Sequence, residues 1–140
     1  MSEDQTIFEF SEDISEAEAP DPLPPGDYEG EIRAVAGARS QSTDNQYAAV
    51  SFIIPPDQFP ADYDSTNAPD GMTIIYRRVP LEDDRRSRFF LRRFCDAIGA
   101  PMSKTIDLTE WLGKMAKLTV ANEDWEGLPR SVITRVSEAV

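Results

Sequence analysis

The sequence of 140 residues contains no histidine and only one cysteine. Without histidine there is no Ser-His-Asp or Cys-His catalytic arrangement, no His-ligated zinc site and no general base that ordinarily titrates near neutral pH. A single cysteine excludes an internal disulfide, and Cys95 lies among apolar residues, which favours a buried thiol. The motifs GxxxxGK[ST], GxGxxG and GxSxG are also absent. We therefore predict that the protein is not an enzyme and uses no cofactor.

Long apolar runs are missing as well, because the longest extend over only a few residues, and the N-terminus is acidic. This pattern predicts neither a signal peptide nor a membrane-spanning helix. We therefore expect a cytoplasmic protein with no membrane partner. The acid-rich stretch from Asp57 to Asp70 lacks the ligand spacing of a calcium-binding loop, so no metal site is predicted.

Basic residues are missing from the N-terminal region. Eleven of the 26 acidic residues lie between Met1 and Glu31, and this stretch has no lysine or arginine. The net charge of −12 therefore belongs almost entirely to this region, and the remainder is nearly neutral. Residues 1–24 close with PDPLPP, a composition typical of a disordered segment. We predict an acidic disordered tail over residues 1–24 and a single folded domain over residues 25–140.

The acidic tail also contains four large apolar residues, Ile7, Phe8, Phe10 and Ile14. Two interpretations remain open. A solubilising tail would carry these residues incidentally. Alternatively, an acidic-hydrophobic segment would bind the basic groove of a partner, or fold back over a basic surface of its own chain.

The clearest periodic segment covers residues 80–101 and predicts a helix of about four turns. Asp83 or Asp84 can cap its N-terminus, and Gly99 ends it. One side of this helix is apolar, whereas the other carries five arginines and Phe89. The apolar side consists of Phe90, Leu91, Phe94, Cys95, Ala97 and Ile98. The basic side is either a solvated helix surface or a surface that binds a partner. The residues assigned to a partner- or tail-binding surface are Arg85, Arg86, Phe89, Arg92 and Arg93.

Five segments alternate apolar and polar residues, as half-buried strands do. They cover residues 26–40, 47–54, 72–79, 115–121 and 130–136, with a turn at 122–127 and a short helical turn around 110–112. In the first strand, Tyr28, Gly30, Ile32 and Ala34 share one side. Because the helix falls between the third and fourth strands, the fold class predicted is mainly β, a five-stranded OB-like Greek-key barrel with one covering helix.

Several segments carry a family resemblance: PPGDYEGEI, the Tyr47–Ile54 strand, FFLRRFCDAIGAP, DLTEWLGKMAKLTV and the closing turn with its strand. Together, from about Pro25 to Val136, they resemble a family of small phage-encoded proteins that are regarded as single-stranded-DNA-binding. In that family a PxGxYxxxI opening starts the first strand, and a helix ending in IG or TG precedes a Leu-x-G segment. The resemblance implies an OB-like fold, an accessory role in replication or recombination and a location in the host-cell cytoplasm. This body departs from the family in having few lysines and in the N-terminal position of its acidic stretch.

Binding of a single nucleic-acid strand requires cations for the backbone and flat side chains on which bases stack. In an OB barrel the second and third strands with their flanking loops usually form the binding face. Trp125, in the predicted turn, either stacks on a base or lies across its own hairpin. The residues predicted to bind nucleic acid are Arg33, Arg39, Tyr47, Phe52, Tyr76, Arg77, Arg78 and Trp125.

The sequence thus predicts a single-stranded-DNA-binding accessory protein whose acidic tail modulates binding or recruits replication or recombination proteins. The alternative is an acidic protein-interaction module, or a DNA mimic, that binds a nucleic-acid-processing protein. A DNA mimic is the weaker form of this alternative, because the acids cluster in the tail rather than on ordered strands spaced like phosphates. Oligomerisation is compatible with both functions.

Overall fold

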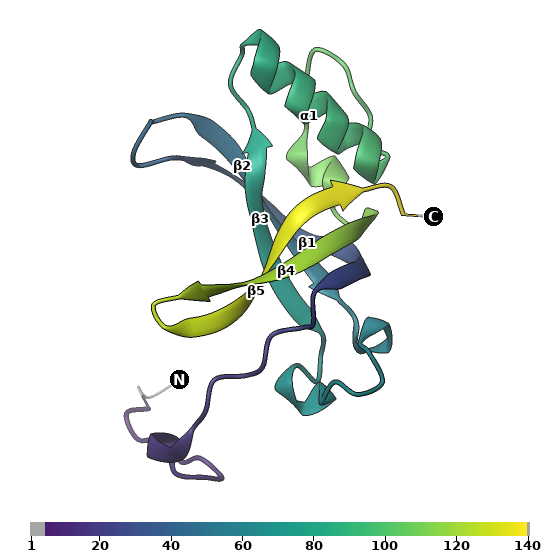
Figure 1. The fold of residues 1–140 in the computed structure, drawn as a ribbon. Helices are drawn as coiled ribbons and strands as arrows, with labels where there is room; N and C mark the ends of the chain where they lie inside the picture. The colour runs from purple at the N-terminus through teal and green to yellow at the C-terminus, as the bar shows by residue number, and fades with distance from the viewer. Residues whose placement is uncertain (1–4, 140) are drawn as a thin grey trace.

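The computed structural model describes residues 5–139 and has a mainly β fold with one α-helix (Figure 1). The strands are β1 (Gly26–Arg39), β2 (Gln46–Ile54), β3 (Met72–Pro80), β4 (Met115–Trp125) and β5 (Leu128–Ser137). Helix α1 (Arg85–Ile98) follows β3, and short 3-10 helices lie at Ile14–Glu16, Pro56–Gln58, Ser65–Asn67 and Leu108–Trp111. The five predicted strands and the helix between the third and fourth of them are confirmed.

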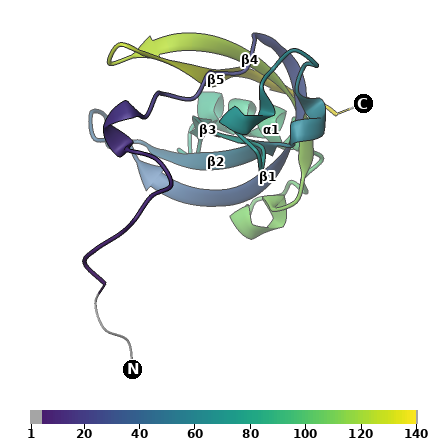
Figure 2. The ribbon, with the colours of Figure 1, turned by 90° about the horizontal axis from the view of Figure 1, so that it is seen from below.

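Neighbouring strands are antiparallel, and their order across the sheet is β3-β2-β1-β4-β5. Strand β1 pairs with β4 through residues 26–31 and with β2 through residues 31–39, so it joins the two halves of the sheet. The sheet curls strongly, and its edge strands β3 and β5 contact each other (Figure 2). Helix α1 packs against β3, β4 and β5 and covers one end of the curled sheet (Figure 1).

Strand β1 bends where it changes partner. A Cβ atom at Gly30 would lie 2.6 Å from Leu118 Cδ1 and 3.2 Å from the carbonyl oxygen of Ile53, so glycine permits this close approach. A β-bulge follows, because the register with β2 shifts between Ile32 and Ala34. The strict alternation predicted that Ala34 shares the inward side of β1, and this was wrong. The extra residue in the bulge reverses the sides, so that Ala34 is exposed and Val35 packs against the core.

The core is enclosed between the curled sheet, α1 and the 3-10 helix at Leu108–Trp111. Trp111 packs on Phe94 of α1 with ring centroids 5.1 Å apart, and Phe94 stacks on Tyr76 of β3 at 6.0 Å. Burial of such large apolar side chains stabilises the fold by about 1.5–3 kcal/mol each. The largest fully buried side chains are Trp111, Phe52, Leu23, Ile32, Ile54 and Leu118.

Phe52 was predicted to contact nucleic acid, and the structure corrects this assignment. Its side chain is 0% exposed and lies in the centre of the core. Tyr47 and Phe52 are five positions apart on β2, so their side chains project to opposite faces of the strand. One surface therefore cannot present both aromatic rings.

The folded body begins before residue 25, the predicted boundary. Leu23 is fully buried, and its N–H donates to Ser131 Oγ of β5 at 2.9 Å. Asp21 is held by the side chains of Tyr63 and Asn67. Residues 5–20 are almost entirely exposed and contain only the 3-10 turn at Ile14–Glu16. Residues 1–4 of the predicted tail lie outside the described residues, and the disorder of the tail stays a prediction.

Helix α1 begins and ends as its sequence predicts. Asp84 caps its N-terminus by accepting a hydrogen bond from the Ser87 N–H at 2.8 Å, and Gly99 ends it at a positive φ of 70°. Its apolar side faces the core through Phe94, Cys95 and Ile98. In residues 5–139, no helix has the length and apolarity needed to cross a membrane.

The aspartate caps predict how acid weakens the fold. Hydrogen bonds from the Ser87 N–H and hydroxyl lower the pKa of Asp84, and those from the Thr109 hydroxyl and N–H lower the pKa of Asp107. A carboxyl group whose pKa is lowered by folding stabilises the folded state at pH values above its pKa in the unfolded chain, about 3.9. This stabilisation is lost as the pH falls through the lower pKa of the folded state. Asparagine caps helices equally well but does not titrate. Asp84→Asn with Asp107→Asn should therefore leave the Tm nearly unchanged at pH 7 and reduce its decrease between about pH 4 and pH 2.

Thermal unfolding followed by circular dichroism over this pH range measures the effect. Asp70→Asn with Asp124→Asn is the matched control, because neither residue caps a helix. The same decrease of Tm in the cap variant and in the wild type would contradict the assignment.

Candidate nucleic-acid interface

A cleft of about 1120 Å³ opens between the tip of the β1–β2 hairpin, strand β3 and the beginning of α1. Arginines from three elements and three aromatic side chains line it. Glu82 is the one acidic residue among the described residues of its lining. The charged and aromatic lining residues are Arg39, Arg77, Arg78, Arg86, Glu82, Tyr47, Tyr76 and Phe90. The cleft therefore combines positive charge with flat apolar surfaces.

Arg77 and Arg78 are both exposed because β3 contains a bulge. Ala48 pairs with Val79, but Val50 pairs with Tyr76, so β3 holds one residue more than β2 over this span. In a regular strand, adjacent side chains point to opposite faces, and one of the two arginines would point inward. The bulge places both guanidinium groups on the surface, where both line the cleft.

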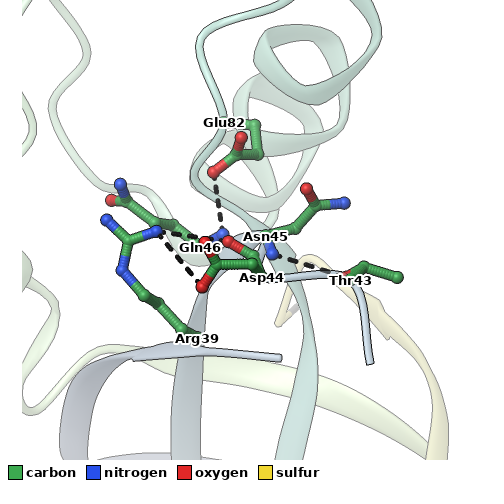
Figure 3. A network of polar contacts seen from close by, with 6 residues as sticks. All are labelled: Arg39, Thr43, Asp44, Asn45, Gln46 and Glu82. Atoms are coloured by element: carbon green, nitrogen blue, oxygen red, sulfur yellow. Dashed lines mark hydrogen bonds and ion pairs between the residues drawn. The ribbon is translucent and has the colours of Figure 1, made fainter. Parts of the chain in front are cut away.

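The tip of the β1–β2 hairpin is ordered by polar contacts (Figure 3). Arg39 Nη1 donates to the Asp44 carbonyl at 3.2 Å and lies 3.8 Å from the Asp44 carboxylate. The Gln46 N–H donates to Glu82 Oε2 at 2.8 Å, which ties the hairpin to the segment that leads into α1. The Glu82 carboxylate is thus held at the wall of the cleft by the Gln46 N–H, whose positive end compensates part of its negative charge.

A second cleft of about 460 Å³ continues the first between β3, α1 and the end of β5. The two clefts share Tyr76, Arg78 and Phe90, and the second adds Arg93 and Arg135. We call the two clefts together the arginine trough. The acidic residues of its described lining are Glu82 in the first cleft and Asp96 and Glu138 in the second.

Two aromatic residues form the middle of the arginine trough. Desolvation raises the pKa of Tyr76, although the charges of Arg78 and Arg93 act in the opposite direction, so the phenol stays protonated at neutral pH and can donate a hydrogen bond. The Arg86 guanidinium lies over the Phe90 ring, 5.5 Å from its centroid. Phe90 was predicted to lie on the apolar side of α1, yet it is 39% exposed. Its position one turn after Arg86 is the signal in the sequence that indicates this pair.

Trp125 lies at the tip of the β4–β5 hairpin, which projects from the same side of the body as the β1–β2 hairpin (Figure 1). Its ring is 51% exposed, and the Arg130 guanidinium lies 5.3 Å from the ring centroid. The turn is shorter than predicted: β4 continues to Trp125, and only Glu126 and Gly127, both at positive φ, connect it to β5. Such two-residue turns match the twist of the strands that they join.

A third cleft, of about 470 Å³, lies between β3 and β5 and connects Arg77 with Arg130. Its wall also includes Ile75 of β3, which is 44% exposed, and residues 20–22. Arg77 therefore stands between the arginine trough and the β4–β5 hairpin. The acidic N-terminal segment leaves the body at this same place.

The structure brings most, but not all, of the predicted binding residues together. Five predicted nucleic-acid-binding residues line the first cleft, namely Arg39, Tyr47, Tyr76, Arg77 and Arg78. Arg33 is exposed at the bulge of β1, away from these lining residues. Trp125 occupies the neighbouring hairpin tip.

The residues assigned to a partner- or tail-binding surface are divided between two sides of α1. Arg86 and Arg93 line the arginine trough, whereas Arg92 lines a groove on the other side of the helix. Phe89 and Arg85 are exposed, and Phe89 lies edge-on against Phe90 at a centroid distance of 5.7 Å. The sequence patterns missed Arg130 and Arg135, which are five positions apart and would lie on opposite faces of a regular strand. Strand β5 contains a bulge, because Thr119 pairs with Arg135 whereas Val120 pairs with Ile133.

No protein-family model matches the chain, and no curated protein matches its sequence. The resemblance to phage single-stranded-DNA-binding proteins therefore stays a prediction. Among residues 5–139, no group of three or more acidic or cysteine side chains is placed to hold a metal ion.

Proposed function

We propose that the protein binds single-stranded DNA in the arginine trough, as an accessory protein without catalytic activity. The observation that carries this proposal is the first cleft, where four arginines surround Tyr47, Tyr76 and Phe90. Arginines from separate elements provide contacts to successive phosphates, and aromatic rings between them provide stacking surfaces for bases. This combination favours a single strand over a duplex, because the bases of a duplex are stacked inside and cannot reach the rings.

The topology supports an OB-type fold, which we include in the proposal. The strand order β3-β2-β1-β4-β5, the contact between β3 and β5, and a helix between β3 and β4 agree with a five-stranded, partly open Greek-key barrel. Proteins with that fold usually bind oligonucleotides on the second and third strands and the loops beside them. The arginine trough and the two projecting hairpins occupy the same positions on this chain.

The acidic N-terminal segment is proposed to compete with DNA for the same arginines. Residues 20–22 line the third cleft together with Arg77 and Arg130, so the segment starts beside the proposed track. Its carboxylates have no basic neighbours in the sequence before Arg33. A high local concentration of negative charge at this position would weaken non-specific binding to nucleic acid.

The test is the fluorescence anisotropy of labelled oligo-dT, titrated with the full-length protein at low and moderate salt. Binding that weakens steeply with salt is expected, as is weaker binding of a duplex of the same length. Charge removal in the tail, by Glu9→Gln, Glu12→Gln, Asp13→Asn and Glu16→Gln together, should tighten binding. Absence of binding by both proteins at low salt would contradict the proposal.

Trp125 provides an optical test of where the strand lies. Trp111 is buried, so the exposed Trp125 is the tryptophan that a bound base can reach. Oligo-dT should quench the fluorescence of the wild type, and Trp125→Phe should abolish the quenching. Trp125→Ala should weaken binding by about 1–3 kcal/mol, the usual value for one stacked base. Arg130→Gln is the control for loss of the neighbouring cation, and should leave the quenching in place. Quenching that persists in Trp125→Phe would exclude the β4–β5 hairpin from the interface.

The second candidate function is binding to another protein through the acidic segment. The observation in its favour is the exposure of four large apolar residues there: Ile7, Phe8, Phe10 and Ile14. A protein that acts only in this way, including a DNA mimic, would show no affinity for oligo-dT. The anisotropy experiment therefore distinguishes the two functions.

A further inference from the structure

A groove of about 620 Å³ lies on the side of α1 that does not face the arginine trough. It runs between α1 and the segment that follows it, residues 101–106. Apolar side chains form its walls: Leu81, Leu91, Cys95, Met102 and Ile106. Three cations, Arg88, Arg92 and Lys104, and two acids, Glu82 and Asp83, also line it. We call this the α1 groove, and its volume falls in the range of about 300–1,000 Å³ that is common for binding sites.

The α1 groove is open and its charges are available. Met102 is 46% exposed, although it belongs to an apolar wall. The ion pairs of Arg88 with Asp83 and of Arg92 with Asp96 are both solvent-exposed. Exposed pairs of this kind contribute little, so the arginines can change partner at small cost. The groove is therefore suited to a segment that is both apolar and acidic.

The N-terminal segment of this protein has that chemistry. Ile7, Phe8, Phe10 and Ile14 are between 62% and 82% exposed. Glu9, Glu12 and Asp13 lie between them in the sequence, and no cation lies before Arg33. An exposed acidic and apolar segment and an open apolar groove, whose lining carries one more cation than acids, are thus present in one chain.

We propose that residues 7–14 of one molecule bind in the α1 groove of a second copy. The aromatic and aliphatic side chains enter the groove, and the carboxylates face Arg88, Arg92 and Lys104. The α1 groove is a different surface from the arginine trough, because the two are on different sides of the helix. A segment held in the groove of a second copy does not compete with DNA for the trough.

The length of the segment favours a second copy over the molecule's own groove. The segment leaves the body at residues 20–22, at the end opposite α1 (Figure 1). Fully extended, the ten Cα-to-Cα steps from Pro20 to Phe10 span at most about 36 Å. A body of this size has a radius of gyration of about 13 Å. A path over its surface from one end to the opposite end is therefore roughly 50 Å long. The segment is too short for that path.

The contact joins two different surfaces, so every molecule offers one segment and one groove. Contacts of this heterologous type continue from molecule to molecule and produce open chains unless a ring closes. The mean mass in solution should therefore increase with protein concentration and pass that of a dimer.

The test uses the full-length protein in sedimentation velocity over a concentration series, without DNA. The segment variant is Phe8→Ser with Phe10→Ser, and the groove variant is Arg92→Glu with Met102→Glu. All four side chains are exposed, so both variants should keep the wild-type Tm. Each variant alone is expected to stay monomeric. An equimolar mixture should form dimers but no longer chains, because only the segment of one variant and the groove of the other remain intact.

Phe89→Ser is the matched control, since it removes an exposed aromatic ring from the other side of α1 and should associate as the wild type does. Three results would overturn the proposal. In the first, the wild type stays monomeric at all concentrations. In the second, the segment variant or the groove variant associates as strongly as the wild type, and in the third, the equimolar mixture of the two variants stays monomeric. The last result is expected if the segment binds only within its own molecule.

Discussion

Phe52→Ala is expected to lower the free energy of unfolding by about 3–5 kcal/mol, the usual cost of removing a fully buried phenylalanine. The side chain is 0% exposed and belongs to the same buried core as Phe94 of α1 and Trp111 of the 3-10 helix. Neighbouring residues relax only partly, so the loss of apolar burial is added to the cost of a cavity. This loss is a large fraction of the total stability of a small domain.

Urea unfolding, followed by tryptophan fluorescence, measures the change. Phe52→Leu is the first control and should cost much less, because it keeps most of the side-chain volume. Tyr47→Ala is the second control. Tyr47 lines the first cleft on the opposite face of β2, so its removal should weaken oligo-dT binding more than it weakens the fold. A Phe52→Ala protein of wild-type stability that fails to bind DNA would restore Phe52 to the interface.

Arg77→Ala with Arg78→Ala is expected to weaken binding of oligo-dT about tenfold at low salt. Both guanidinium groups line the first cleft, and each also reaches a neighbouring cleft, so a bound strand must pass them. Each lost phosphate contact on a single strand should make the slope of log K against log salt less steep by about 0.7. The double variant should therefore reduce the steepness by about 1.4.

The fold should tolerate this change, because both side chains are exposed and neither is among the described salt bridges. Lys114→Ala with Lys117→Ala is the matched control. It removes the same charge from β4 and from the residue before it, away from the residues that line the arginine trough. An affinity and a salt slope that are unchanged in the arginine variant would place the site elsewhere. Equal effects of the two variants would indicate a response to net charge alone.

The two proposals fail separately. The arginine variant leaves residues 7–14 and the α1 groove intact, so it should self-associate as the wild type does. The segment and groove variants keep the arginine trough, so their monomers should retain affinity for short oligo-dT. Loss of both properties in one variant would point to a damaged fold, which its Tm would reveal.

The sequence by itself determined the secondary structure and its order. Alternation with a period of two predicted all five strands, and helical periodicity with Asp84 and Gly99 at its ends predicted α1 closely. These features depend on interactions between near neighbours in the chain. The five alternating segments and the single helical one likewise predicted the mainly β class of the fold.

Only the tertiary structure decided which side chains share a surface. The bulges in β1 and β3 arise from pairing between strands, and they move Ala34 outward and expose both Arg77 and Arg78. The alternation of β2 identifies two faces but not which one is buried, because both carry apolar residues, and the sequence therefore assigned Phe52 to the binding surface although it is buried. The arginines of the arginine trough come from β1, β3, α1 and β5 and are up to 96 positions apart, Arg39 and Arg135 being the extremes. Such a site depends on strand register and on helix packing, which no local pattern contains.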